Sequence, residues 1–100
     1  MKVSITRISS ALTTNEEYIY RNARLVFYFS SQGEEGNLRE TRIYFNTKGM
    51  FKSSVKANGK ELTAKELATA EYSDFRPNAL NVLKYGKYYM DQFIKNMSYP

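Results

Sequence analysis

The chain has 100 residues, with 15 lysines and arginines against 10 aspartates and glutamates, which gives a formal net charge of +5. It contains no cysteine and no histidine, so disulfides and thiolate metal sites are excluded and the commonest general base is missing. These features predict one domain over residues 1–100, no metal or other cofactor, and acidic partners.

The aromatic residues are unusual in kind, because nine are tyrosines, six are phenylalanines and none is a tryptophan. Tyrosine is common at half-exposed surfaces and at interfaces. No segment approaches the run of about 20 apolar residues that a membrane span needs, and the first ten residues lack the apolar core of a signal peptide. We therefore expect a cytoplasmic protein that does not engage membranes.

The amino-terminal part predicts an antiparallel sheet of about four strands. Alternating and β-branched residues place them roughly at residues 2–9, 17–31, 38–46 and 50–57. The second segment is long for one strand, and an interruption near Asn22 is left open. The glycine-containing loop 32–37 suits a hairpin with its two glutamates in water, and Asn58-Gly59 marks a tight turn.

Successive side chains of a strand point to opposite faces of a sheet, so each segment divides into two faces. If the apolar faces share one side, the predicted core face collects Val3, Ile5, Ile19, Leu25, Phe27, Phe29, Ile43, Phe45, Phe51 and Val55. The opposite, exposed face collects Lys2, Tyr18, Tyr20, Arg24, Tyr28, Arg42, Tyr44, Lys52 and Lys56. With this register, four segments form one continuous surface of tyrosines and cations.

The carboxyl-terminal part predicts two helices, roughly at residues 63–73 and 77–97, packed on one face of the sheet. Thr63 and Glu66 have the spacing of a capping box. Pro77 suits the first position of the second helix. Gly86, in the middle of that helix, either permits close packing or divides the helix in two. The predicted fold class is therefore α+β.

We interpret the surface of tyrosines and cations as a partner-binding site. Tyrosine and arginine are the usual anchors of protein interfaces, and sheet platforms stack aromatic rings on unpaired bases. The alternative is that cross-strand tyrosine pairs only stabilise a solvated sheet. The predicted partner-binding residues are Tyr18, Tyr20, Arg24, Tyr28, Arg42, Tyr44, Lys52 and Lys56.

The function expected from these observations is non-catalytic binding to an acidic surface of a protein or nucleoprotein complex. A small basic chain without motifs has the general character of inhibitors that phages and other mobile elements encode, anti-CRISPR proteins among them, and the prediction extends that analogy. Direct binding of single-stranded DNA or RNA is the alternative. A metal-free, toxin-type ribonuclease is the third interpretation, because tyrosine, lysine, arginine and glutamate can serve such chemistry. A homodimer through the same face is left open.

Overall fold

In the computed structural model, which describes residues 1–9, 12–33 and 38–97, a single antiparallel sheet is the largest element. Each strand pairs with the next one along the chain, in the order β1 to β6, as short hairpin connections allow. The strands are β1 Lys2–Ser9, β2 Leu12–Arg21, β3 Arg24–Gln32, β4 Arg39–Asn46, β5 Gly49–Ala57 and β6 Lys60–Glu61. The two glutamates predicted at the tip of the 32–37 loop lie outside the described residues.

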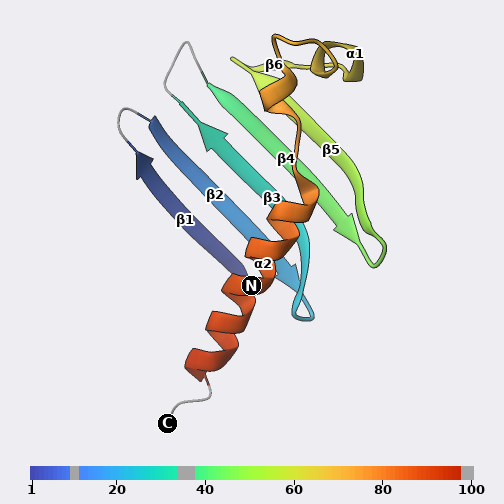
Figure 1. Cartoon of the computed structure of the whole chain (residues 1–100). Helices are drawn as coiled ribbons and strands as arrows, with labels where there is room; N and C mark the ends of the chain where they lie inside the picture. The colour runs from blue at the N-terminus through green and yellow to red at the C-terminus, as the bar shows by residue number, and fades with distance from the viewer. Residues whose placement is uncertain (10–11, 34–37, 98–100) are drawn as a thin grey trace.

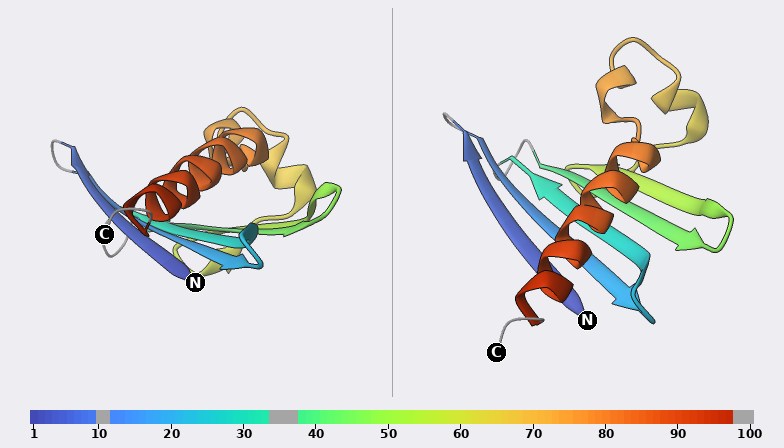
Figure 2. Two further views of the ribbon diagram at one scale, coloured as in Figure 1. Left: turned by 90° about the horizontal axis from the view of Figure 1, so that it is seen from below. Right: turned by 60° about the horizontal axis from the view of Figure 1, so that its bottom comes forward.

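One long helix covers one face of this sheet (Figure 1). The chain continues from β6 into α1 (Ala64–Leu67), a 3₁₀ turn η1 (Ser73–Phe75) and α2 (Ala79–Met97), which has 19 residues. Figure 2 shows α2 crossing the strands obliquely in a layer of its own, on one side of a twisted sheet. The predicted arrangement of four strands and two packed helices is therefore wrong: in the described part of the chain the sheet has six strands, and one long helix packs on it. Within the described residues, no helix has the length and apolarity needed to cross a membrane.

The predicted strand at residues 17–31 is in fact two strands joined by a tight turn. Asn22 and Ala23 both have positive φ angles, 53° and 62°, as the two central residues of a type I′ hairpin turn require. The turn reverses the chain, so that β2 and β3 pair with each other. The segment before it is also longer than predicted, since β2 begins at Leu12.

Two irregularities shift the register of the sheet. One lies between Ile19 and Tyr20 in the β2–β3 pair, and the other between Tyr44 and Phe45 in the β4–β5 pair. Bulges of this kind increase local twist and bend the bulged strand. Both lie near the same end of the sheet, where the β2–β3 and β4–β5 hairpins turn.

The capping box is confirmed, although the helix it starts is short. The Thr63 hydroxyl accepts from the Glu66 backbone N–H at 3.1 Å, and the Glu66 carboxylate accepts from the Thr63 N–H at 3.1 Å. The predicted helix at 63–73 nevertheless ends at Leu67. Two backbone carbonyls of its last turn accept hydrogen bonds from side chains. Arg76 donates to the Leu67 carbonyl at 2.7 Å, and the Thr69 hydroxyl donates to the Glu66 carbonyl at 2.6 Å.

The helix predicted at 77–97 is close to the observed α2. The Asn78 side chain accepts from the Asn81 backbone N–H at 3.1 Å and caps the first turn. Gly86 does not divide the helix, and α2 passes close to the sheet at this residue: a Cβ here would lie 2.8 Å from Cδ2 of Leu25. The Tyr20 hydroxyl donates to the Gly86 carbonyl at 2.6 Å across the same contact.

The core contains Tyr18 and Tyr20 of β2 and Tyr28 of β3, which is the reverse of the prediction for residues 18–20 and 27–29. Tyr18, Tyr20 and Tyr28 are buried against α2. Ile19, Phe27 and Phe29, predicted to be core, lie on the other face and are half-exposed. The prediction holds for the core positions Val3, Ile5, Leu25, Ile43, Phe45 and Val55, and fails for Phe51, which is exposed.

The inversion has a physical reason. A buried tyrosine hydroxyl must have a hydrogen-bond partner, and all three hydroxyls find one beneath α2. Once those bonds are made, the rings bury as much apolar surface as phenylalanines would.

Candidate binding surface

The sheet face that α2 leaves uncovered carries side chains in rows that run across the strands. The pairing register gives three rows: Lys2, Ile19, Phe27, Tyr44 and Lys52; then Ser4, Glu17, Phe29, Arg42 and Ser54; then Thr6, Asn15, Ser31, Glu40 and Lys56. Arg21 and Arg24, paired opposite each other, extend this face at the turn of the β2–β3 hairpin. We call these residues together the open face. None of them is buried.

Aromatic rings form the centre of the open face, and cations lie over two of them. The rings of Phe27 and Tyr44 contact each other across neighbouring strands, with centroids 4.9 Å apart and planes tilted by 53°. The Lys52 ammonium lies 5.5 Å from the centroid of Tyr44, and the Arg42 guanidinium lies 4.7 Å from that of Phe29. Cation–π contacts at exposed sites are worth about 0.5–1 kcal/mol. The rings and cations therefore form one ordered surface.

The charge of the open face is strongly one-sided. Its two acids are both neutralised, Glu17 by Lys2 at 3.2 Å and Glu40 by Arg42 at 3.7 Å. The four remaining cations form no ion pair within the described part of the chain; they are Arg21, Arg24, Lys52 and Lys56. The open face thus presents unpaired positive charge around half-exposed rings.

The β2–β3 hairpin turn contains a backbone conformation and a charge pair that are both locally destabilising. Ala23 occupies the left-handed region with φ of 62°, which costs a residue with a side chain about 1–2 kcal/mol. Arg21 and Arg24 are directly opposite each other, and like charges in that position are destabilising. Such features concentrate at functional sites, so this turn is a candidate contact point.

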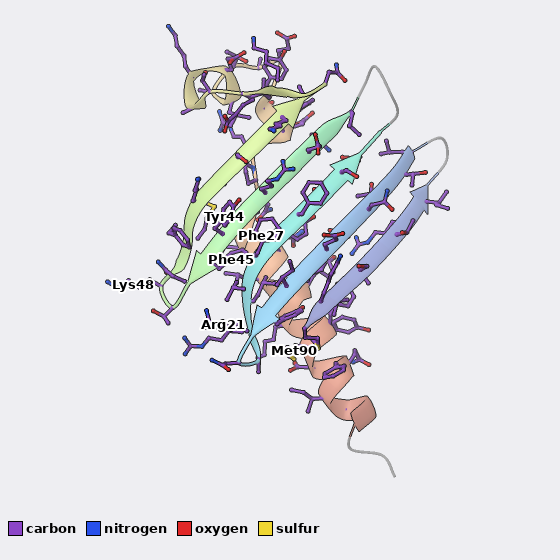
Figure 3. The ribbon with its side chains drawn as sticks, turned by 180° about the vertical axis from the view of Figure 1, so that it is seen from behind. Arg21, Phe27, Tyr44, Phe45, Lys48 and Met90 are labelled. Atoms are coloured by element: carbon purple, nitrogen blue, oxygen red, sulfur yellow. The ribbon has the colours of Figure 1, made fainter. Side chains whose placement is uncertain are left out.

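A groove lies between this turn and the turn of the next hairpin. The β3–β4 pairing stops at Phe27 and Tyr44, so the two hairpins separate beyond that pair. The groove has a volume of about 510 Å³ and is lined by Arg21, Asn22, Arg24, Leu25, Val26, Phe45, Asn46 and Thr47. Figure 3 shows Arg21 and Lys48 at the two hairpin turns at one end of the sheet, with Phe27 and Tyr44 further along the strands.

The eight predicted partner-binding residues separate into two groups. Arg24, Arg42, Tyr44, Lys52 and Lys56 lie together on the open face. Tyr18, Tyr20 and Tyr28 lie beneath α2 with 1–7% of their surface exposed. The open face therefore retains the predicted cations and one predicted tyrosine, while the other three tyrosines belong to the core.

Two of the buried tyrosines, Tyr18 and Tyr28, belong to a polar cluster centred on Glu16, whose side chain is 10% exposed. Oε2 of Glu16 accepts from the Tyr28 hydroxyl at 2.6 Å and from the Tyr18 hydroxyl at 3.2 Å. Oε1 has no hydrogen-bond partner among the described residues but lies 3.1 Å from Nε of Arg7, as an ion pair. Arg7 also donates to the Tyr89 hydroxyl on α2 at 2.9 Å. A cavity of about 220 Å³ adjoins the cluster. These contacts join β1, β2, β3 and α2, which favours a structural role.

The electrostatics of this cluster follow from burial. Burial raises the pKa of Tyr18 and of Tyr28 far above the usual value of 10, and the nearby Glu16 charge acts in the same direction. Burial raises the pKa of Tyr20 to about 12. The hydrogen bond with Tyr89 raises the pKa of Arg7. Neutral tyrosines and a charged arginine are thereby maintained around the carboxylate.

The open-face residues that sequence reasoning assigned to the core are Ile19, Phe27 and Phe29, and Arg21 was not selected as a partner-binding residue. A signal for them was present in the sequence. Glu17 and Arg21 lie on the same strand face as Ile19, and charged residues are rarely buried without partners. Their alternation with Ile19 indicated a face in contact with water.

In comparisons with known proteins, no family model, no curated protein and no solved structure matches the chain.

Proposed function

We propose that the chain is a non-catalytic binding protein that occupies an acidic surface of a partner protein or nucleoprotein complex with its open face. One observation carries the proposal: among the described residues, four cations of that face form no ion pair, whereas both of its acids are neutralised. An acidic partner would complement this surface and would be attracted to it at long range.

The same charge pattern argues against a second copy of the chain as the occupant. A symmetric dimer places one patch against an identical patch, so two copies joined by their open faces would oppose basic side chains to basic side chains. Like-charge contacts across an interface cost several kcal/mol. A dimer through this face is therefore disfavoured relative to an acidic partner.

Inhibition by occupation is the mode of action that this surface suits. The proposal follows the analogy with small inhibitors of mobile elements, which block a host complex by covering one of its surfaces. Rings with cations over them provide the anchors that interfaces commonly use. Neutralising phosphate or carboxylate groups would add electrostatic specificity.

Retention of a partner by matched charge variants tests the proposal. The wild type, an open-face variant (Arg24→Glu with Lys52→Glu) and an α2 variant (Lys84→Glu with Lys95→Glu) would be immobilised and exposed to lysate of the cells in which the protein acts. The two variants have the same net charge. We expect one acidic partner to be retained by the wild type and the α2 variant, and to be lost from the open-face variant. Equal retention by all three proteins would contradict the proposal.

A further inference from the structure

Resting on the proposed function, we propose that the acidic component contacted by the open face is a single-stranded nucleic acid, and that the groove between the hairpin turns holds one of its bases. The inference combines three observations. Two aromatic rings of the open face each have a cation beside them, the β3–β4 pairing ends next to the groove, and the groove is lined by both apolar residues and arginines.

The repeat of rings and cations identifies the chemistry of the ligand. Tyr44 has Lys52 beside it, and Phe29 has Arg42 over it. A ligand that satisfies this pattern offers a flat ring and a negative charge in each repeating unit. A single-stranded nucleic acid does so, and sheets bind it by stacking bases on aromatic side chains while cations contact phosphates.

Phe27 has an aromatic ring over which no cation lies within the described part of the chain. Its pair with Tyr44 is also the last rung of the β3–β4 ladder before the hairpins separate. A base stacked on Phe27 would leave the next nucleotide at the mouth of the groove. The rings of Phe27 and Phe29 lie on one strand two residues apart, about 7 Å at the usual rise per residue.

The groove has the lining that a base needs. Leu25, Val26 and Phe45 line it with apolar groups, and Arg21 and Arg24 are among its other lining residues. An unpaired base can enter such a groove while its phosphate reaches an arginine. A base within a duplex cannot, because pairing keeps it in the helix. An acidic peptide provides charge, but does not present a ring at every unit.

Fluorescence anisotropy with defined probes tests the inference. The probes are labelled single strands of DNA and of RNA of about 12 nucleotides, a duplex of the same sequence, and polyphosphate. We expect both single strands to bind more tightly than the duplex and the polyphosphate. Affinity should fall between about 50 and about 200 mM salt, because phosphate contacts release counterions.

Three variants separate stacking, charge and groove filling. Phe27→Ala should weaken binding about fivefold or more, as loss of a stacked base does, with little change in the salt dependence. Arg21→Ala with Arg24→Ala should reduce the slope of log K against log salt by about 1.4. Val26→Trp fills the groove without changing charge, and should weaken binding of the single strands but leave polyphosphate unaffected. Lys84→Ala with Lys95→Ala, on α2, is the charge-matched control.

The outcomes distinguish this inference from the proposed function. Absence of single-strand binding at about 50 mM salt would overturn the inference. The proposed function would stand if a protein partner were still retained through the open face. Polyphosphate binding as tight as single-strand binding would overturn the role of stacking and of the groove. Single-strand binding that is equal in the wild type and in all open-face variants would also overturn the inference, whereas the proposed function is overturned only by equal retention of the partner by the two charge variants. Circular dichroism and thermal melts of every variant confirm that losses are not due to unfolding.

Discussion

The hydrogen bond from Tyr28 to Glu16 offers the most direct test of the inverted core. The Tyr28 hydroxyl donates to Oε2 of Glu16 at 2.6 Å, beneath α2. The bond is short and its acceptor is a carboxylate, which places it among the stronger hydrogen bonds in proteins. Hydrogen bonds to charged groups contribute about 1.5–3 kcal/mol. Tyr28→Phe removes the hydroxyl and keeps the ring, so the bond to Glu16 is lost together with the hydroxyl's contact with Ser30.

We expect Tyr28→Phe to lower the free energy of unfolding by about 2 kcal/mol. The value lies below the upper limit because Oε2 keeps the longer bond from Tyr18 at 3.2 Å. In a domain of this size, about 2 kcal/mol corresponds to a fall in Tm of roughly 8–16 °C. Tyr44→Phe is the matched control, because Tyr44 lies on the open face and its hydroxyl makes no hydrogen bond within the described contacts.

Urea denaturation followed by circular dichroism measures both variants under the same conditions. Tyr44→Phe should change the unfolding free energy by less than about 0.5 kcal/mol, as surface substitutions usually do. If Tyr28→Phe changed the unfolding free energy as little as Tyr44→Phe does, Tyr28 would not lie beneath α2, and the assignment of the two sheet faces would be wrong.

Three further predictions use the same urea assay. Ala23→Gly should raise the unfolding free energy by about 0.5–1 kcal/mol, since glycine adopts the positive φ of 62° without strain. Gly86→Leu should lower it by about 2 kcal/mol through overpacking against Leu25, and adding Leu25→Ala should restore part of the loss. Because burial raises the pKa of Tyr20 to about 12, its contribution to stability is complete below pH 10 and is lost as the pH rises from 10 to 12; Tyr20→Phe should make stability less dependent on pH in this window.

Much of the secondary structure is readable from the sequence because local chemistry decides it. The bounds of β1, β4 and β5 follow from alternation and β-branched residues, and the predicted segments match them within about one residue. The capping box at Thr63 and the turn at Asn58-Gly59 follow from side-chain geometry and from the freedom of glycine. In each case the signal lies within a few residues of the element that it specifies.

The turn at Asn22-Ala23 could not be placed firmly for the same kind of reason. Asn58-Gly59 and Asn22-Ala23 adopt the same positive φ conformation, but only the first has glycine at its second position. Alanine is disfavoured there by its Cβ. The pairing of β2 with β3 and their contacts with α2 stabilise a turn that the local sequence does not favour. Because the turn was not predicted, β2 and β3 were predicted as one strand.

The choice of core face depended on contacts that are distant in the sequence. Hydrophobicity alone places Phe27 rather than Tyr28 in the core. The difference is made by Glu16 and by the Gly86 carbonyl, which accept hydrogen bonds from the tyrosine hydroxyls across separate elements. Neither contact is visible in the alternation of a single strand. Of the candidate site, the cations Arg42, Lys52 and Lys56 were predictable, because no arrangement of the sheet readily buries them.

The buried hydroxyls and the open face are two consequences of one arrangement. Because the tyrosines are satisfied beneath α2, Phe27 and Phe29 are left half-exposed on the other face, where aromatic rings favour association with other molecules. Arg42 and Lys52 over the neighbouring rings add charges that oppose contact with a second copy. The same charges attract a polyanion. A surface of rings among cations thus disfavours binding to a second copy and favours a ligand that carries both rings and negative charge. The nucleic-acid inference depends on this property.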